Sequence, residues 1–212
     1  PNAFWYRPEY VMLRRSLHNV SMYLGVSDGL EADEGSPSSW SKKDPTSTRS
    51  SADDALINSS LSIANRALQL PASVWKSDYY HLFLPIAEKK EIDTSFLLSI
   101  LQGKDKHVVL PKVVDSENMI HFLLTDSTRL KKSKWNIPEP VDGIEIAPNK
   151  LDVVFVPLLA FDGQGQRVGY GKGFYDRFLA QCRKDAIKIG LSLFGAEERI
   201  SDFEESDIPL DF

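Results

Sequence analysis

One stretch constrains the fold more than any other part of the chain: Leu151–Asp176, LDVVFVPLLAFDGQGQRVGYGKGFYD. It opens with the apolar run Val153–Val156, which is rich in β-branched residues and too short to span a membrane, so it predicts a buried central strand. Five glycines come next, between positions 163 and 173. Phe174 and Phe178 then lie four apart and indicate an apolar helical face. We therefore expect a strand, a glycine-rich loop and a helix in that order.

This order of elements is typical of an anion-binding loop. Glycine permits positive φ and close approach of backbone N–H groups to a ligand, and a helix N-terminus adds unpaired donors. Arg167 and Lys172 would add full positive charges. The alternative is a flexible turn that carries basic residues by chance. The pattern is not a Walker A loop, because position 166 is Gln and a glycine comes after the lysine, and its glycine spacing is wrong for a Rossmann fingerprint.

Composition and charge narrow the class of protein. The 212 residues are 42% hydrophobic and 26% charged, as in an ordinary soluble domain, and the net charge of −5 argues against nucleic acid as a partner. The single cysteine, Cys182, excludes an intrachain disulfide, and its spacing predicts a packed thiol. No stretch reaches the length of a membrane helix, and the N-terminus lacks a signal-peptide pattern. We expect a cytoplasmic protein that binds neither nucleic acid nor a membrane.

The rest of the chain predicts alternating helices and strands. Residues 1–50 lack periodicity and predict a disordered or linker segment, which leaves 51–212 as the folded domain. Helices are expected at 53–70 and from Asp93, as N-cap, to Leu101, with Gly103 closing the second helix. Strands are expected at 79–84, 107–110, 119–124 and 186–193, with His81 as a hydrogen-bonded sheet residue. This alternation predicts a three-layer α/β/α fold with a mainly parallel central sheet and a ligand site at the carboxyl ends of its strands.

Residues 160–179, AFDGQGQRVGYGKGFYDRFL, resemble the signature of the 5-formyltetrahydrofolate cyclo-ligase family, and the resemblance extends over about 60–211. It implies ATP-dependent cyclisation of 5-formyltetrahydrofolate to 5,10-methenyltetrahydrofolate with release of ADP and phosphate, through phosphorylation of the formyl oxygen. The implied cofactor is Mg²⁺, with ATP as co-substrate. The folate carries one or several glutamates, and the protein is expected to be a monomer. The alternative is a catalytically silent protein that keeps the fold and holds folate or nucleotide.

The resemblance also assigns residues to the nucleotide and the metal. Arg167 and Lys172 are the implied catalytic cations, facing phosphate oxygens. Asp176 and Asp207 match magnesium positions; their structural alternatives are a helix N-terminal acid and a surface turn. The implied ATP-binding residues are Arg167, Val168, Gly169, Tyr170, Gly171, Lys172, Gly173, Phe174 and Tyr175.

The folate side of the implied site comes from two segments. Glu91, in KKEIDT, matches a glutamate that recognises the folate, since a carboxylate can accept a pair of pterin N–H donors. Without the resemblance, Glu91 would be interpreted as part of a solvated loop. Leu84 matches an apolar pocket position, and the loop residues Tyr170, Gly171, Lys172, Gly173 and Phe174 also border the folate.

Two further features are left open by the sequence. Met119, Phe122 and Trp135 are either walls for a folate ring or core residues. The family's N-terminal nucleotide clamp, a lysine followed four residues later by an arginine, has no clean match here. Its candidates are Lys42, Lys43 and Arg49, or Arg14 and Arg15.

Overall fold

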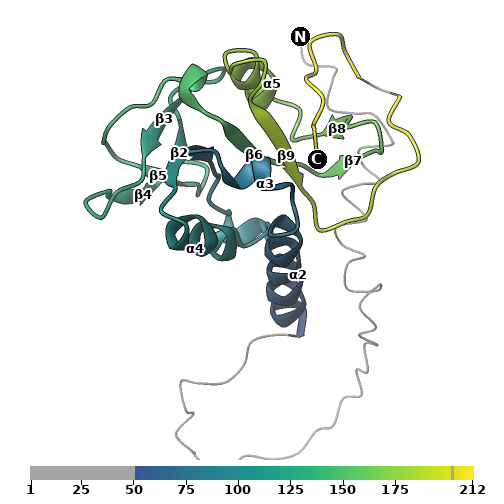
Figure 1. Ribbon diagram of the computed structural model, residues 1–212, viewed down its shortest axis with the longest axis horizontal. Coiled ribbons are helices and arrows are strands. Elements are labelled where there is room, and N and C mark those ends of the chain that lie inside the picture. The colour runs from purple at the N-terminus through teal and green to yellow at the C-terminus, as the bar shows by residue number, and fades with distance from the viewer. Residues whose placement is uncertain (1–50, 202) are drawn as a thin grey trace, which may run out of the picture. The chain divides into compact units, whose positions relative to one another are not determined.

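The computed structural model describes residues 51–201 and 203–212 (Figure 1). The chain divides into two compact units, Pro1–Ala55 and Leu56–Phe212, and the architecture described here is that of the second unit together with the start of its first helix. The predictions made for residues 1–50, including the basic candidates for a nucleotide clamp, lie outside the described residues.

A five-stranded sheet forms the centre of the second unit, with strand order β3-β2-β1-β6-β9. Neighbouring strands are parallel except for β2 and β3, which are antiparallel. The mainly parallel sheet is therefore confirmed. The strands are β1 (Tyr79–His81), β2 (His107–Val113), β3 (Met119–Leu123), β6 (Val153–Pro157) and β9 (Ile187–Leu191).

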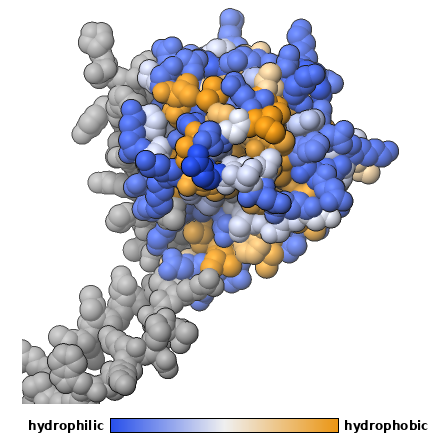
Figure 2. Space-filling view, turned by 90° about the vertical axis from the view of Figure 1, so that its left-hand side faces the viewer, coloured by the Kyte–Doolittle hydropathy of each residue, from blue (hydrophilic) through white to orange (hydrophobic). Residues whose placement is uncertain are grey.

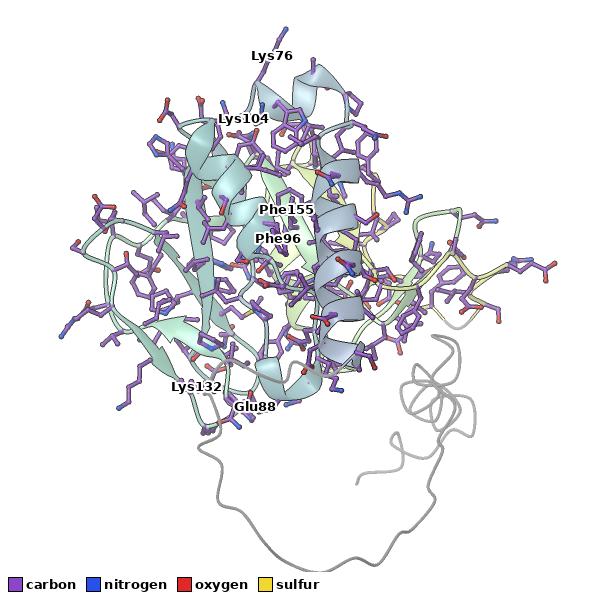
Figure 3. All side chains as sticks on the ribbon, turned by 90° about the horizontal axis from the view of Figure 1, so that it is seen from below. Lys76, Glu88, Phe96, Lys104, Lys132 and Phe155 are labelled. Atoms are coloured by element: carbon purple, nitrogen blue, oxygen red, sulfur yellow. The ribbon has the colours of Figure 1, made fainter. Side chains whose placement is uncertain are left out.

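Helices cover both faces of this sheet. Successive side chains of β6 point to opposite faces, and both sets are apolar, so both faces must be covered. Val153 and Phe155 pack in one hydrophobic core under α2 (Ser51–Ala67), α3 (Ala72–Trp75) and α4 (Ser95–Gly103). Figure 3 shows α2 and α4 in front of the sheet, with Phe96 and Phe155 in the layer between. Val154 and Val156 pack in a second core under α5 (Phe174–Leu179). All four of these β6 side chains are fully buried, and the three-layer α/β/α arrangement is confirmed.

Helix α4 departs from prediction at both termini. Thr94, not Asp93, is the N-cap, and the Asp93 carboxylate accepts the Ser95 N–H at 2.9 Å from one residue further back. The Thr94 hydroxyl is committed elsewhere, because it donates to the Phe83 carbonyl at 2.7 Å. Gly103 is the last helical residue and Lys104 is the C-cap, so the glycine does not terminate the helix.

The order of strands reverses direction between β1 and β6. From β1 the chain passes through α4 to β2 on one side, and from β6 it passes through α5 to β9 on the other, with the two helices on opposite faces. Such a topological switch point opens a crevice at the carboxyl ends of the two strands, where open α/β sheets bind ligands. The segments that leave these ends are residues 82–94 after β1 and residues 158–173 after β6. Residues 169–173, at the end of the second segment, are called the glycine-rich loop below.

Several short elements complete the second unit. They include two antiparallel pairs, β4 (Leu130–Lys132) with β5 (Pro138–Pro140), and β7 (Ala160–Phe161) with β8 (Arg167–Val168). Single 3₁₀ turns occur at Ala87–Lys89 and Pro148–Lys150. Figure 2 shows the face over β3, β4 and β5, where hydrophobic patches (orange) lie between hydrophilic residues (blue).

The last residues of the chain lie against β9 and the β7–β8 turn. The Gly190 N–H donates to the Phe212 carbonyl at 2.8 Å, and the Leu210 N–H donates to the Gly165 carbonyl at 2.9 Å. This segment covers the otherwise unpaired edge of β9. Among the described residues, we find no helix with the length and apolarity that crossing a membrane would require.

Candidate functional site

A buried carboxylate organises the turn that leads into the glycine-rich loop. Asp162 accepts backbone N–H groups from Gln164 at 2.9 Å, Gln166 at 3.0 Å and Ile200 at 2.9 Å. These hydrogen bonds hold the pKa of Asp162 below its ordinary value, with the Ile200 amide the largest cause. The β7–β8 turn is therefore a rigid base for the glycine-rich loop.

A close approach to the C-terminal segment restricts the same turn. Gly165 has φ +83°, and a Cβ added there would lie 2.4 Å from the Leu210 carbonyl oxygen. Only glycine fits this position without moving the backbone.

The loop itself, residues 169–173, contains three glycines. Gly171 and Gly173 have φ of 72° and 62°, in the left-handed region that glycine adopts without strain. The N–H groups of residues 169–173 donate to no acceptor in the described part of the chain. A row of unpaired N–H groups is what an anion-binding loop requires. The next helix, α5, has only six residues, so its dipole adds little to this effect.

Arg167 is the first residue of β8, and its guanidinium is already paired with a carboxylate. Its guanidinium donates to the Asp176 carboxylate at 2.5 Å and to the Ile208 carbonyl, and only 6% of the side chain is exposed. The Ile208 N–H also donates to Asp176, at 3.2 Å. Arg167 thus joins β8, α5 and the C-terminal segment, and in this state its charge is directed at Asp176.

The two predicted metal residues lie on neighbouring segments. Ile208, whose N–H donates to Asp176, is adjacent in sequence to Asp207, whose carboxylate accepts the Glu204 N–H at 3.0 Å. Within residues 51–201 and 203–212, no group of three or more His, Cys, Asp or Glu residues could hold a metal ion. Two carboxylates are the oxygen donors that Mg²⁺ prefers, but they fit such an ion only together with phosphate oxygens and water.

Lys172 is exposed at the loop and faces an aromatic ring. Its Nζ lies 5.4 Å from the Trp135 ring centroid, and the Lys134 Nζ lies 4.3 Å from the same centroid. Lys172 makes no ion pair with a described residue. Trp135 therefore borders the loop, whereas Phe122 is in the core and Met119 packs against the core under α5.

The tip of the loop meets the predicted folate residue. Tyr170 Oη donates to Glu91 Oε1 at 2.7 Å, although the two are 79 residues apart. The other oxygen, Oε2, accepts the Ile86 N–H at 2.8 Å, and the Lys89 Nζ lies 4.7 Å from the Tyr170 ring centroid. Burial and the Glu91 carboxylate raise the pKa of Tyr170. The structure thus brings the two predicted binding segments together across the switch point.

Leu84 and Cys182 pack against the two hydrophobic cores. Leu84 is half-buried and packs against the core under α2 and α4. Cys182 packs beneath α5, and burial raises the pKa of its thiol to about 11, as expected of a packed thiol. An open cavity of about 250 Å³ beside α5 is lined in part by Cys182 and Ile208. A second, of about 270 Å³ beside the β4–β5 pair, contains neither Leu84 nor Cys182 in its lining.

A buried histidine pair under α5 was missed by the sequence interpretation. His81 and His121 have ring centroids 5.3 Å apart, and Phe178 stacks on His121 at 4.2 Å. None of their four ring nitrogens makes a hydrogen bond of normal distance and angle in the described part of the chain. A weaker approach of His81 to the Phe155 backbone raises the pKa of His81, against the larger effect of burial. His81 is therefore not the fully hydrogen-bonded residue that the sequence predicted. The alternation of β3, which puts His121 on one face with Met119 and Leu123, was the available signal.

Arg177 was also missed. Its guanidinium donates to the carbonyl oxygens of Lys172 at 2.8 Å and Glu117 at 2.9 Å. Nothing in the local sequence distinguishes this arginine from a solvated helix residue, because both acceptors are backbone atoms placed by the fold.

Comparisons with known proteins agree with the resemblance seen in the sequence. The model of the 5-formyltetrahydrofolate cyclo-ligase family matches residues 45–211. A 5-formyltetrahydrofolate cyclo-ligase of Mycoplasma genitalium is 50% identical over 120 residues, which cover 50% of this chain and 73% of that protein. A probable 5-formyltetrahydrofolate cyclo-ligase of Schizosaccharomyces pombe is 29% identical over 173 residues, covering 76% and 81%. The solved structure of Aquifex aeolicus 5,10-methenyltetrahydrofolate synthetase superposes with a TM-score of 0.63 at 32% identity, covering 75% of this chain and 78% of that one.

Proposed function

Because the chain belongs to the 5-formyltetrahydrofolate cyclo-ligase family, we propose that it catalyses the ATP-dependent cyclisation of 5-formyltetrahydrofolate to 5,10-methenyltetrahydrofolate. The structural observation that carries this proposal is the contact between Tyr170 and Glu91 at the switch point. It joins two segments. One is a loop whose N–H groups have no acceptor among residues 51–201 and 203–212, which suits phosphate, and the other carries a carboxylate that suits pterin N–H donors.

The chemistry explains why two substrates must meet there. A formamide carbonyl is a poor electrophile, and its oxygen leaves badly. Transfer of the γ-phosphoryl group breaks its bond to ADP and forms a bond to the formyl oxygen. The folate N10 then attacks the formyl carbon, loses its proton, and phosphate departs with the oxygen. Because N10 belongs to the same molecule, ring closure gains the advantage of proximity, and the protein mainly positions groups and balances charge.

We assign the phosphate end to the glycine-rich loop. The N–H groups of residues 169–173 would bind phosphate oxygens, and Lys172, exposed and without an ion pair to a described residue, would balance the charge that develops on transfer. Arg167 must exchange its Asp176 partner before it can touch a phosphate. Asp176 and Asp207 would hold Mg²⁺ together with phosphate oxygens, which is how this ion is usually bound beside nucleotides.

We assign the folate end to Glu91, Leu84 and the residues from Tyr170 to Phe174. The folate, with one or several glutamates, enters where Tyr170 now meets Glu91. We further propose a cytoplasmic monomer that binds neither nucleic acid nor a membrane. The net charge of −5 and the single packed thiol support this part of the proposal.

The test is absorbance at the methenyl-folate band after mixing the full-length protein, 5-formyltetrahydrofolate and MgATP. We expect the band to grow with ATP and to stay at background when ATP or protein is omitted. Absence of turnover by folded protein would refute the enzyme assignment.

One observation favours a second candidate, a silent protein that holds folate or nucleotide on this fold. Arg167 is nearly buried and neutralised by Asp176, which leaves one fewer cation for catalysis. Binding of either ligand by calorimetry, with no methenyl-folate formed, would support this second candidate.

A further inference from the structure

Arg177, the fourth residue of α5, joins the glycine-rich loop to the turn between β2 and β3. One guanidinium nitrogen donates to the Lys172 carbonyl at 2.8 Å, and Nε donates to the Glu117 carbonyl at 2.9 Å. The guanidinium also lies 5.4 Å from the Phe174 ring centroid. The side chain therefore spans from the loop to the edge of the sheet, touching backbone at both ends.

The far end of this bridge is itself rigid. In the β2–β3 turn the Asp115 carboxylate accepts the N–H groups of Glu117 at 2.7 Å and Asn118 at 2.8 Å. It also accepts the Asn118 side-chain amide at 2.9 Å. The pKa of Asp115 lies below its ordinary value, with Asn118 the largest cause and the charge of Arg177 a smaller one. Arg177 is thus held against a turn that does not depend on the loop for its shape.

At the loop end of the bridge, Arg177 fixes the orientation of the Lys172–Gly173 peptide. In a trans peptide the C=O and the N–H of the next residue point in opposite directions. The Lys172 carbonyl points at Arg177, so the Gly173 N–H points away from it, and that N–H has no acceptor in the described part of the chain. The Gly173 carbonyl is held as well, by the Arg177 backbone N–H at 3.1 Å.

Glycine is required at position 173 for the same geometry. Its φ is 62°, and a Cβ added there would lie 2.8 Å from an Arg177 guanidinium nitrogen. A side chain would therefore both strain the backbone and push the arginine away from the loop.

We propose that Arg177 is a positioning residue, which orients the Lys172–Gly173 peptide so that the Gly173 N–H faces the ATP phosphates. This rests on the proposed function, since it takes the loop to be the phosphate site. Arg177 itself touches no phosphate; it acts through the peptide that it holds. Its loss leaves the Lys172 carbonyl free to rotate, and the Gly173 N–H loses its direction.

The experiment compares Arg177→Ala, Arg177→Lys and the wild-type protein in two assays, ATP binding by calorimetry and steady-state turnover. For Arg177→Ala we expect ATP affinity to fall roughly tenfold, as for the loss of one charge-assisted hydrogen bond. We expect KM for ATP to rise by a similar factor while KM for 5-formyltetrahydrofolate changes little. Arg177→Lys keeps one donor for the Lys172 carbonyl and should recover part of the loss.

The matched control is Arg183→Ala. Arg183 pairs with Asp152 and Asp185, away from the loop, so its loss removes charge and ion pairs without touching the Lys172–Gly173 peptide. It should leave both KM values unchanged. Thermal unfolding of every variant separates a positioning effect from a loss of fold.

The outcomes test the positioning role of Arg177 and the proposed reaction separately. If Arg177→Ala lowers the melting temperature but leaves ATP affinity and KM unchanged, or raises both KM values equally, the positioning role is wrong. If the wild-type protein binds ATP without turnover and Arg177→Ala binds it more weakly, the positioning role stands and the proposed reaction fails. Wild-type protein that binds no ATP would overturn both.

Discussion

The buried histidine pair predicts that the fold weakens in mild acid. His81 and His121 lie beneath α5. Their rings face each other, Tyr175 and Phe178, and His81 also approaches the Phe155 backbone. Burial lowers the pKa of His121 from 6.5 to about 4. Burial, and then the neighbouring His121, lower the pKa of His81 well below 6.5. Neither ring can gain a proton in the native state without a charge being placed in the core.

The sign and size come from linkage between protonation and folding. A histidine whose pKa is lower in the native state than in the unfolded state stabilises the fold fully above about pH 6.5 and progressively less as the pH falls toward its native pKa. For His121, with values of 6.5 and about 4, the loss of unfolding free energy between about pH 7.5 and about pH 5 is about 2 kcal/mol. His81 adds a loss of the same sign. Burial raises the pKa of Glu139, which acts in the opposite direction just above pH 4.5.

The assay is urea unfolding followed by circular dichroism at the two pH values. His121→Phe keeps a ring against Phe178 but cannot be protonated, so the pH-dependent loss should shrink by about 2 kcal/mol relative to the wild type. A change in packing alters the unfolding free energy equally at both pH values, and Glu139 contributes equally in both proteins. Both contributions therefore cancel when the pH-dependent losses of the two proteins are compared. His107→Gln, which changes an exposed histidine of β2, should retain the wild-type difference. Equal losses in the wild type and His121→Phe would refute the reasoning.

Three further variants test the site. Lys172→Ala should lower turnover by about 100-fold without changing thermal stability, because the side chain is exposed and its proposed role is to balance charge on the transferred phosphate; unchanged turnover would remove the lysine from the proposed mechanism. Glu91→Gln should raise KM for 5-formyltetrahydrofolate by roughly tenfold and KM for ATP much less, because the folate loses a charged acceptor; equal rises would indicate a general defect of the crevice. Gly165→Ala should destabilise the fold by about 2–4 kcal/mol in urea unfolding, because φ is +83° and the new Cβ meets the Leu210 carbonyl. The matched change Gly163→Ala, where a Cβ meets nothing within 4 Å, should cost far less.

The central sheet could be predicted because its residues carry the information locally. The run Val153–Val156 has no polar residue, as a strand covered on both faces requires, and it became the fully buried part of β6. The alternation of β3 likewise separates Met119 and Leu123, which pack in the core under α5, from Phe122 on the other face. The strands β4, β5, β7 and β8 are too short, at two or three residues, to carry a period. Their pairing depends on neighbours that the fold supplies.

The residues of the candidate site could be predicted more readily than their partners. The glycines and Lys172 were proposed from their spacing, and Glu91 was proposed from the resemblance. That Arg167 pairs with Asp176 and the Ile208 carbonyl, or that Arg177 holds two backbone oxygens, depends on segments brought together by the sheet. The residue type of an arginine does not reveal whether the side chain faces a phosphate or a carboxylate, so only the fold distinguishes these roles.

The hydrogen bond between Tyr170 and Glu91 makes the two halves of the crevice energetically interdependent. Any molecule that takes the Glu91 oxygen from Tyr170 releases the tip of the loop, and any molecule that reshapes the loop releases the carboxylate. Thermodynamic reciprocity then requires that each substrate change the affinity of the other by the same factor. The strength of this coupling is thereby a property of one phenol and one carboxylate, and altering either changes it.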